Sequence, residues 1–181
     1  MIATGIVIHR CNPALMGARA KLRHKDTKTF DKVFQNLYTP LQVLQPVVAG
    51  LDLRFGWSSM PGAAVYWGVP LMLLSMGWIA WVMAVNPFAE PSVRIQKERG
   101  QRVISRGPYR FMRHPMYTGM LVLYPASAVV LGSVWVLAMG GLMGVLLLVR
   151  TGLEDRTLKA ELPGYRDYAA ATRYRLIPGL W

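Results

Sequence analysis

Long runs without charged residues divide the chain into apolar and polar segments. Residues 63–85 contain no Asp, Glu, Lys or Arg, and neither do residues 114–149. The first run has the roughly 20 residues that a transmembrane helix requires. The second would make a helix of about 54 Å, much longer than a hydrocarbon core of about 30 Å. It must therefore fold back on itself, and we expect the turn at Gly132-Ser133.

A third uncharged run, residues 33–51, precedes these two and is less apolar. It contains two prolines and four amide side chains, yet it is long enough for a first span. Together the runs predict an all-α integral membrane protein with about four transmembrane helices, the last two forming a C-terminal hairpin. Gly140 and Gly144 have the GxxxG spacing that is typical of closely packed helices.

The cationic residues lie in the segments that flank these runs. The net charge is +12, and 20 of the 21 Lys and Arg residues fall within residues 10–32, 86–113 and 150–181. An even number of crossings places these three segments on one side of the membrane, and an excess of Lys and Arg marks the cytoplasmic side. We therefore expect both ends to be cytoplasmic. This segregation argues against a nucleic-acid partner, which requires a soluble basic face.

Residues 1–32 are expected to form a basic N-terminal segment, and residues 33–181 one membrane domain. The apolar stretch at residues 1–8 is far too short to cross a bilayer and lacks the preceding basic region of a signal peptide. One interpretation is that it is the remnant of a further helix. Cys11 is the only cysteine, so neither an internal disulfide nor a cysteine-based metal site can form.

The stretch best suited to chemistry is residues 107–119, where a basic loop enters the long uncharged run. The proline at position 115 disfavours a helical conformation for His114, while Pro115 itself suits the first turn of a helix. A loop that leads into a helix N-terminus offers free backbone N–H groups to an anionic ligand. The cluster of Tyr109, Arg113, His114 and Tyr117 therefore predicts a pocket at the membrane surface.

The last helix is expected to continue past the membrane to about residue 162, because Pro163-Gly164 is the first sequence that breaks it. Arg150 and Glu154 then lie on the same face, four residues apart. Taken alone, they can equally be an ordinary surface ion pair. The hairpin turn, however, would bring both residues close to His114.

Five motifs occur together in this arrangement: Gly107-Pro108-Tyr109, Arg113-His114-Pro115-Met116-Tyr117, Arg150-x3-Glu154-Asp155, Pro163-Gly164-Tyr165-x2-Tyr168 and Arg175-Leu176-Ile177-Pro178. In this respect residues 33–181 resemble the isoprenylcysteine carboxyl methyltransferase family. Related phospholipid N-methyltransferases share parts of the pattern. The family consists of small membrane enzymes that methylate lipophilic acceptors.

The resemblance implies that the cytoplasmic loop and tail form a pocket for S-adenosylmethionine. The implied cofactor contacts are Gln96, Gln101, Arg102, Val103, Ile104, Tyr109, His114, Pro115, Met116, Tyr117 and Glu154. Arg150 corresponds to a substrate-binding arginine, and Arg150 and His114 are the candidate catalytic residues. Asp155 departs from the pattern, since a second Glu is usual there. The implied partners are a lipophilic acceptor and membrane lipids, with no metal.

Elementary chemistry agrees with this assignment. Methyl transfer from a sulfonium depends mainly on alignment of the reacting groups. Glu154 suits the ammonium of the cofactor, and the helix N-terminus suits its carboxylate. The ring of Tyr109 or Tyr117 can hold the sulfonium by cation–π contact, worth about 0.5–2 kcal/mol.

Two other functions are compatible with the sequence. Sterol reductases resemble the same C-terminal region, which would imply a reduced nicotinamide cofactor, and a non-enzymatic membrane adaptor is the third interpretation. For a methyltransferase, the acceptor group can be a carboxylate, an amine or a thiol. His114 alone can also be a helix-capping or interfacial histidine, and the tyrosines can belong to an aromatic belt.

Overall fold

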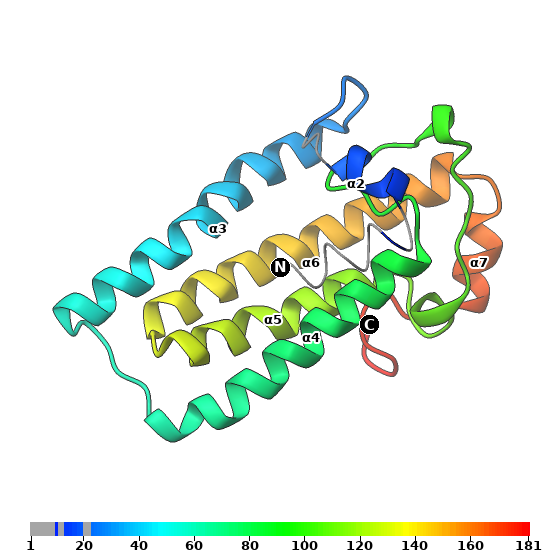
Figure 1. The fold of residues 1–181 in the computed structure, drawn as a ribbon. Helices are drawn as coiled ribbons and strands as arrows, with labels where there is room; N and C mark the ends of the chain where they lie inside the picture. The colour runs from blue at the N-terminus through cyan, green and yellow to red at the C-terminus, as the bar shows by residue number, and fades with distance from the viewer. Residues whose placement is uncertain (1–9, 11–12, 20–22) are drawn as a thin grey trace.

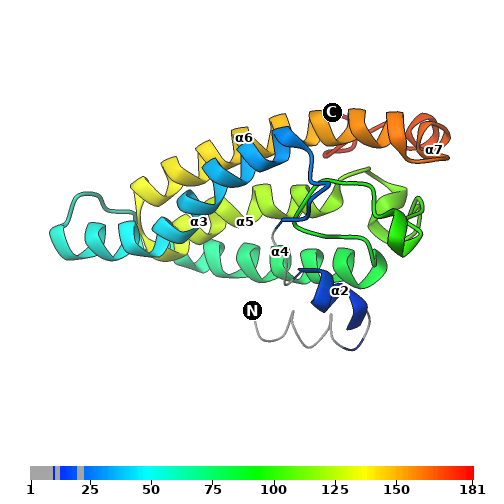
Figure 2. The same ribbon diagram turned by 90° about the horizontal axis from the view of Figure 1, so that it is seen from above.

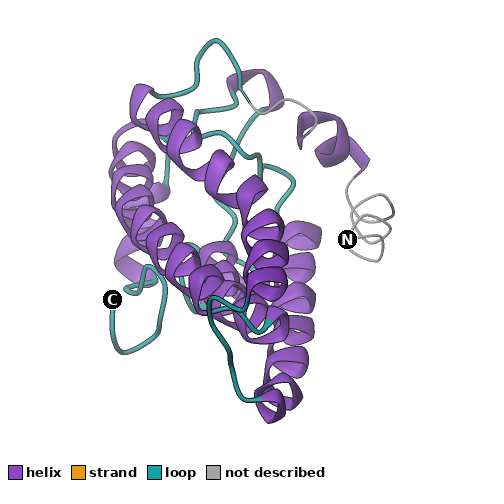
Figure 3. Cartoon of the chain, turned by 90° about the vertical axis from the view of Figure 1, so that its left-hand side faces the viewer, coloured by secondary structure: helices purple, strands orange, loops and turns teal. Residues whose placement is uncertain are grey.

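The computed structural model describes residue 10 and residues 13–19 and 23–181. The apolar stretch at residues 1–8, interpreted above as the remnant of a helix, lies outside these residues. Within the described part of the chain every regular element is a helix, as Figure 3 shows by colour, so the prediction of an all-α protein is confirmed.

Four long helices form the body of the molecule: α3 (Thr29–Phe55), α4 (Val65–Val85), α5 (Pro115–Leu131) and α6 (Val134–Glu161). They lie side by side in the order α3, α6, α5, α4 (Figure 1), and Figure 2 shows the same helices from above, with α3 in front of α6. A short 3-10 turn, Gly62–Ala64, extends α4 at its start. The predicted helix over residues 63–85 is therefore confirmed.

Glycines allow α5 to pack closely against both of its neighbours. A Cβ atom at Gly68 of α4 would lie 2.8 Å from Val129, and one at Gly119 of α5 would lie 2.7 Å from Ile79. On the other side of α5, Gly140 faces Tyr124 and Gly144 faces Leu121. The GxxxG spacing thus serves helix packing, as the sequence predicts.

The hairpin turn lies at Gly132-Ser133, as predicted. Gly132 has φ +67°, a left-handed conformation that suits glycine, and it ends α5. The hydroxyl of Ser133 accepts a hydrogen bond from the Val136 N–H and so caps α6. Ser133 also donates to the buried carboxylate of Asp52, which ties the end of α3 to the hairpin.

In the part of the chain that the structure describes, two helical segments are long and apolar enough to cross a membrane. They are Gly62–Val85, with mean hydropathy 1.8, and Val134–Glu161, with 1.9; only 22% and 39% of their apolar windows are buried within the protein. A core helix of a soluble protein would be mostly buried, so the exposure favours a lipid environment. Helix α5 has 17 residues. Helix α3 does not meet the same criterion, because amides and terminal charges interrupt it.

The remaining elements gather at one end of this body, around the start of α5 and the end of α6 (Figure 1). They are η2 (Lys97–Arg99), η3 (Gly107–Arg110), α7 (Tyr165–Ala171) and α2 (Pro13–Arg19). Leu15 of α2 is fully buried against Met83 and Ala89. Helix α5 begins at Pro115, and helix α6 ends just before Leu162, both as the sequence predicts.

Candidate functional site

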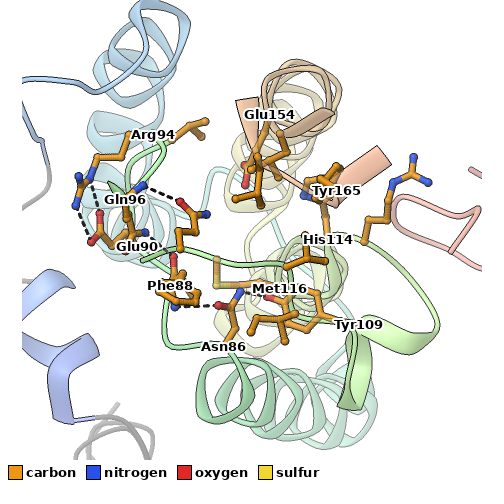
Figure 4. Close-up of a pocket in the computed structure, with 18 of the residues that line it drawn as sticks. Asn86, Phe88, Glu90, Arg94, Gln96, Tyr109, His114, Met116, Glu154 and Tyr165 are labelled. Atoms are coloured by element: carbon orange, nitrogen blue, oxygen red, sulfur yellow. Dashed lines mark hydrogen bonds and ion pairs between the residues drawn. The ribbon is translucent and has the colours of Figure 1, made fainter. Parts of the chain in front are cut away.

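A cavity lies at this end of the molecule, between the loop that follows α4 and the facing sides of α5, α6 and α7 (Figure 4). It holds about 820 Å³ of empty space, part of it open to solvent. Its lining includes all but one of the residues predicted from the sequence: Gln96, Gln101, Arg102, Val103, Ile104, Tyr109, His114, Met116, Tyr117, Arg150 and Glu154.

Pro115 is the exception. It is buried at the first turn of α5, and its carbonyl accepts a hydrogen bond of 2.7 Å from the Trp78 indole. Pro115 therefore starts α5 and packs against α4, and it does not line the cavity.

His114 is fixed through its backbone and lies at the cavity wall. Its N–H donates to the carbonyl of Arg175 at 2.8 Å, which pairs the loop with the C-terminal tail. The imidazole stacks parallel to the ring of Tyr117, with centroids 5.8 Å apart. Its Nε2 is buried 3.6 Å from Asp155 and has no hydrogen-bond partner among the described residues. The side chain does not cap α5, so that alternative is wrong.

Glu154 supplies a half-buried carboxylate to the same space. One of its oxygens accepts a hydrogen bond from the Tyr117 hydroxyl at 2.5 Å, so the phenol orients the carboxylate. Tyr109 lies on another wall, where its hydroxyl accepts from the Asn86 amide at 2.7 Å. Burial raises the pKa of Tyr109 above its ordinary value, so this phenol stays protonated and can donate a hydrogen bond.

Arg150 pairs with a residue that the sequence does not single out. Its Nε lies 2.8 Å from the carboxylate of Asp31 on α3, and its Nη2 donates to the Pro91 carbonyl at 2.6 Å. The guanidinium also packs over the rings of Phe34, at 4.5 Å, and Tyr117, at 5.4 Å. Because Arg150 is buried, the interpretation as an ordinary surface pair is wrong.

Asp155 is the centre of a second network of ion pairs and hydrogen bonds. In the sequence, this residue stands out only as a departure from the family pattern. Its side chain is 1% exposed and lies 2.8 Å from Arg113 Nε. Further contacts come from Lys159 at 3.0 Å, Tyr165 at 3.1 Å and Arg175 at 3.2 Å. The network fixes the loop before α5, the end of α6 and the tail relative to one another.

A third charged group holds the loop that follows α4. Arg94, almost fully buried, pairs with Glu90 at 2.9 Å and with the more exposed Asp26 and Glu98. Burial lowers the pKa of Arg94, but the hydrogen bonds that its guanidinium donates to these carboxylates outweigh this effect and raise the pKa above its ordinary value. The cation is therefore permanent.

Both polar groups of the Gln96 side chain are used within this loop. The amide donates to the Phe88 carbonyl at 2.8 Å and accepts from Arg99 at 2.7 Å. The Gln96 N–H in turn donates to the Gln101 side chain at 2.7 Å. Gln96 thus shapes the cavity wall through the loop that it stabilises.

The cavity combines an apolar wall with a polar one. Apolar side chains pack in one cluster there, including Val103, Leu158, Leu162, Tyr165 and Tyr168. The polar groups include the Glu154 carboxylate and the Tyr109 hydroxyl. Such a lining fits a ligand with a flat apolar part and a charged polar part. Among the described residues, no three His, Cys, Asp or Glu side chains form a metal-ligating group.

Comparison with known families gives one match. The family model for phospholipid methyltransferases matches residues 63–161, which is more than half of the chain. The matched region runs from the start of α4 to the end of α6 and contains every predicted site residue. A search of curated proteins finds no match.

Proposed function

Because the chain belongs to the phospholipid methyltransferase family and is therefore a methyltransferase, we propose that it transfers a methyl group from S-adenosylmethionine to a lipophilic acceptor. We propose further that it most resembles the isoprenylcysteine carboxyl methyltransferases. The observation that best supports a methyl transfer site is the cavity. Residues from the loop after α4, from α5 and from α6 line one space, although the sequence separates them by up to 72 positions, from Asn86 to Leu158.

The residues present fit the cofactor. Glu154 would pair with its ammonium group, and the positive N-terminal end of α5 would face its carboxylate. The buried His114 imidazole, 3.6 Å from Asp155, would form part of the wall beside it. Val103, Leu158 and Leu162 would cover the adenine. When bound, the cofactor supplies an electrophilic methyl group on a sulfonium, and the protein's task is to align it with the acceptor.

Arg150 would lie on the acceptor side of the cavity. It is one helical turn nearer the apolar part of α6 than Glu154 is, which is where the polar group of a lipophilic molecule would stop. Asp31 and Pro91 hold its guanidinium in place, so its position does not depend on the acceptor. The acceptor group can be a carboxylate, an amine or a thiol.

The fold suggests how the enzyme would sit in a membrane. We propose that α3, α4, α5 and α6 all cross it, with the cavity at the cytoplasmic face. The start of α3, the loop after α4 and the end of α6 lie at one end of the bundle, and these regions hold the basic segments (Figure 1). Helix α3, at about 40 Å, is long enough to cross, whereas α5, at about 26 Å, is near the lower limit.

Ligand binding to the detergent-solubilised protein tests the proposal. Calorimetry should show binding of S-adenosylmethionine and no binding of NADPH. Methyl transfer would then be followed with three acceptors: an N-acylated S-farnesylcysteine, phosphatidylethanolamine vesicles and 1-dodecanethiol. Binding of NADPH alone would favour the reductase, and binding of neither cofactor would favour the membrane adaptor.

A further inference from the structure

Ser92 is a buried polar residue that the site described above does not use. It is 6% exposed and lines the cavity. Its hydroxyl has no hydrogen-bond partner among the described residues. Burial of a hydroxyl without a partner is unfavourable, so such a group in a cavity wall indicates a polar ligand.

The backbone on both sides of Ser92 is held in place. The carbonyl of Pro91 accepts from Arg150 at 2.6 Å, and the N–H of Val93 donates to Asp31 at 2.8 Å. The carbonyl of Val93 also accepts from the N–H of Lys28 at 3.0 Å. The Ser92 hydroxyl therefore belongs to a segment that is fixed to α3 and α6.

This position assigns Ser92 to the acceptor side. Its neighbour Pro91 contacts Arg150, the residue proposed for the acceptor, whereas the residues proposed for the cofactor begin at Gln96. We propose that the Ser92 hydroxyl hydrogen-bonds the heteroatom-bearing polar group of the methyl acceptor and positions it beside Arg150. The inference rests on the proposed function and adds a binding residue to it.

A hydroxyl suits this task because it both donates and accepts hydrogen bonds. It can therefore position a carboxylate, an amine or a thiol, and it brings no charge that would compete with the ion pair of Arg150 and Asp31. Loss of one neutral hydrogen bond typically weakens binding about twofold to tenfold.

The test uses the full-length protein saturated with S-adenosylhomocysteine, which lacks the transferable methyl group. Binding of the farnesylcysteine derivative, the phosphatidylethanolamine vesicles and 1-dodecanethiol is measured for the wild type, Ser92→Ala and Ser92→Thr. We expect Ser92→Ala to weaken binding of the probe that binds the wild type about fivefold to tenfold, and Ser92→Thr to recover most of it. The affinity for S-adenosylhomocysteine should stay within twofold.

Thermal stability distinguishes a ligand-binding serine from a structural one, because replacing a structural serine would lower the Tm. Because the hydroxyl has no hydrogen-bond partner among the residues that the structure describes, Ser92→Ala should keep the wild-type Tm or raise it. Ser105→Ala, an exposed serine in the same connection that does not line the cavity, is the matched control and should change neither binding nor Tm.

Several results would overturn the inference. These are unchanged probe binding in Ser92→Ala, a weaker affinity for S-adenosylhomocysteine, or a lowered Tm that accounts for the loss. Wild-type protein that binds S-adenosylhomocysteine but none of the three probes would also overturn it. Wild-type protein that does not bind S-adenosylhomocysteine or S-adenosylmethionine would instead refute the proposed function.

Discussion

Replacement of Arg150 by alanine should destabilise the protein as well as impair methyl transfer, and the two effects can be separated. The guanidinium neutralises Asp31, which is 0% exposed, at 2.8 Å. Without it, the carboxylate keeps only hydrogen bonds from Gln35 and from the N–H of Val93. Breaking a buried ion pair in this way costs about 3–5 kcal/mol. Arg150→Ala should therefore lower the free energy of unfolding by about that amount.

A second substitution distinguishes the structural from the functional role. The double variant Asp31→Asn/Arg150→Ala removes both charges of this ion pair. The carboxamide at position 31 can still accept a hydrogen bond from the N–H of Val93. The double variant should therefore recover at least about 2 kcal/mol relative to Arg150→Ala. Methyl transfer should remain impaired in both variants if Arg150 contacts the acceptor, and the affinity for S-adenosylmethionine should be nearly unchanged.

Unfolding by sodium dodecyl sulfate in mixed micelles, followed by circular dichroism, measures the stability of each variant. Arg156→Ala, an exposed arginine on the same helix, is the matched control and should stay within about 0.5 kcal/mol of the wild type. A loss below about 1 kcal/mol in Arg150→Ala would refute the structural reasoning. Recovery of methyl transfer together with stability in the double variant would show that Arg150 has no role toward the acceptor.

Three further outcomes follow from the site and the fold. His114→Ala and Glu154→Ala should each weaken S-adenosylmethionine binding by more than about 1.5 kcal/mol in calorimetry, because each removes a polar partner in a partly dry site; unchanged affinity in both would leave the cofactor assignment unsupported. Cysteines placed at Ser58 and Gly100, in a chain without its native cysteine, should be labelled from opposite sides of the membrane, and labelling from one side would contradict the topology. Asp155→Ala should lower the free energy of unfolding by about 3–5 kcal/mol in the same detergent titration, because it leaves a buried arginine unpaired, and a loss under 1 kcal/mol would show that the network is not structural.

Local signals in the sequence were sufficient for both ends of α5 and for the end of α6, whereas α3 extends four residues beyond the predicted run 33–51 at each end. Pro115 starts α5 because its fixed φ suits a first turn, and Gly132 ends the same helix because it adopts a positive φ. These effects depend on neighbours within a few positions. The residues around the cavity could also be predicted, because the motif resemblance selects them and the hairpin turn brings the two legs together.

The ion pairs that fix the site could not be predicted in this way. Asp31 and Arg150 are 119 positions apart, and no local pattern indicates that α3 packs against α6. Asp155 pairs with Arg113, 42 positions away, and with Arg175, 20 positions away. The sequence shows each of these residues only as a charged residue near the end of an apolar run. Its partner is determined by tertiary packing.

The pairing of the C-terminal tail with the loop before α5 has a consequence for biosynthesis. The N–H groups of Arg113 and His114 donate to the carbonyls of Tyr174 and Arg175, and Thr118 donates to the carbonyl of Leu176. A nascent chain emerges from its N-terminus onward, so the four long helices can insert and associate before these carbonyls have been synthesised. The cavity would then acquire its final shape only after residues 174–176 have left the ribosome. A stalled or prematurely terminated chain would therefore reach the bilayer with its helices in place but without a formed ligand site.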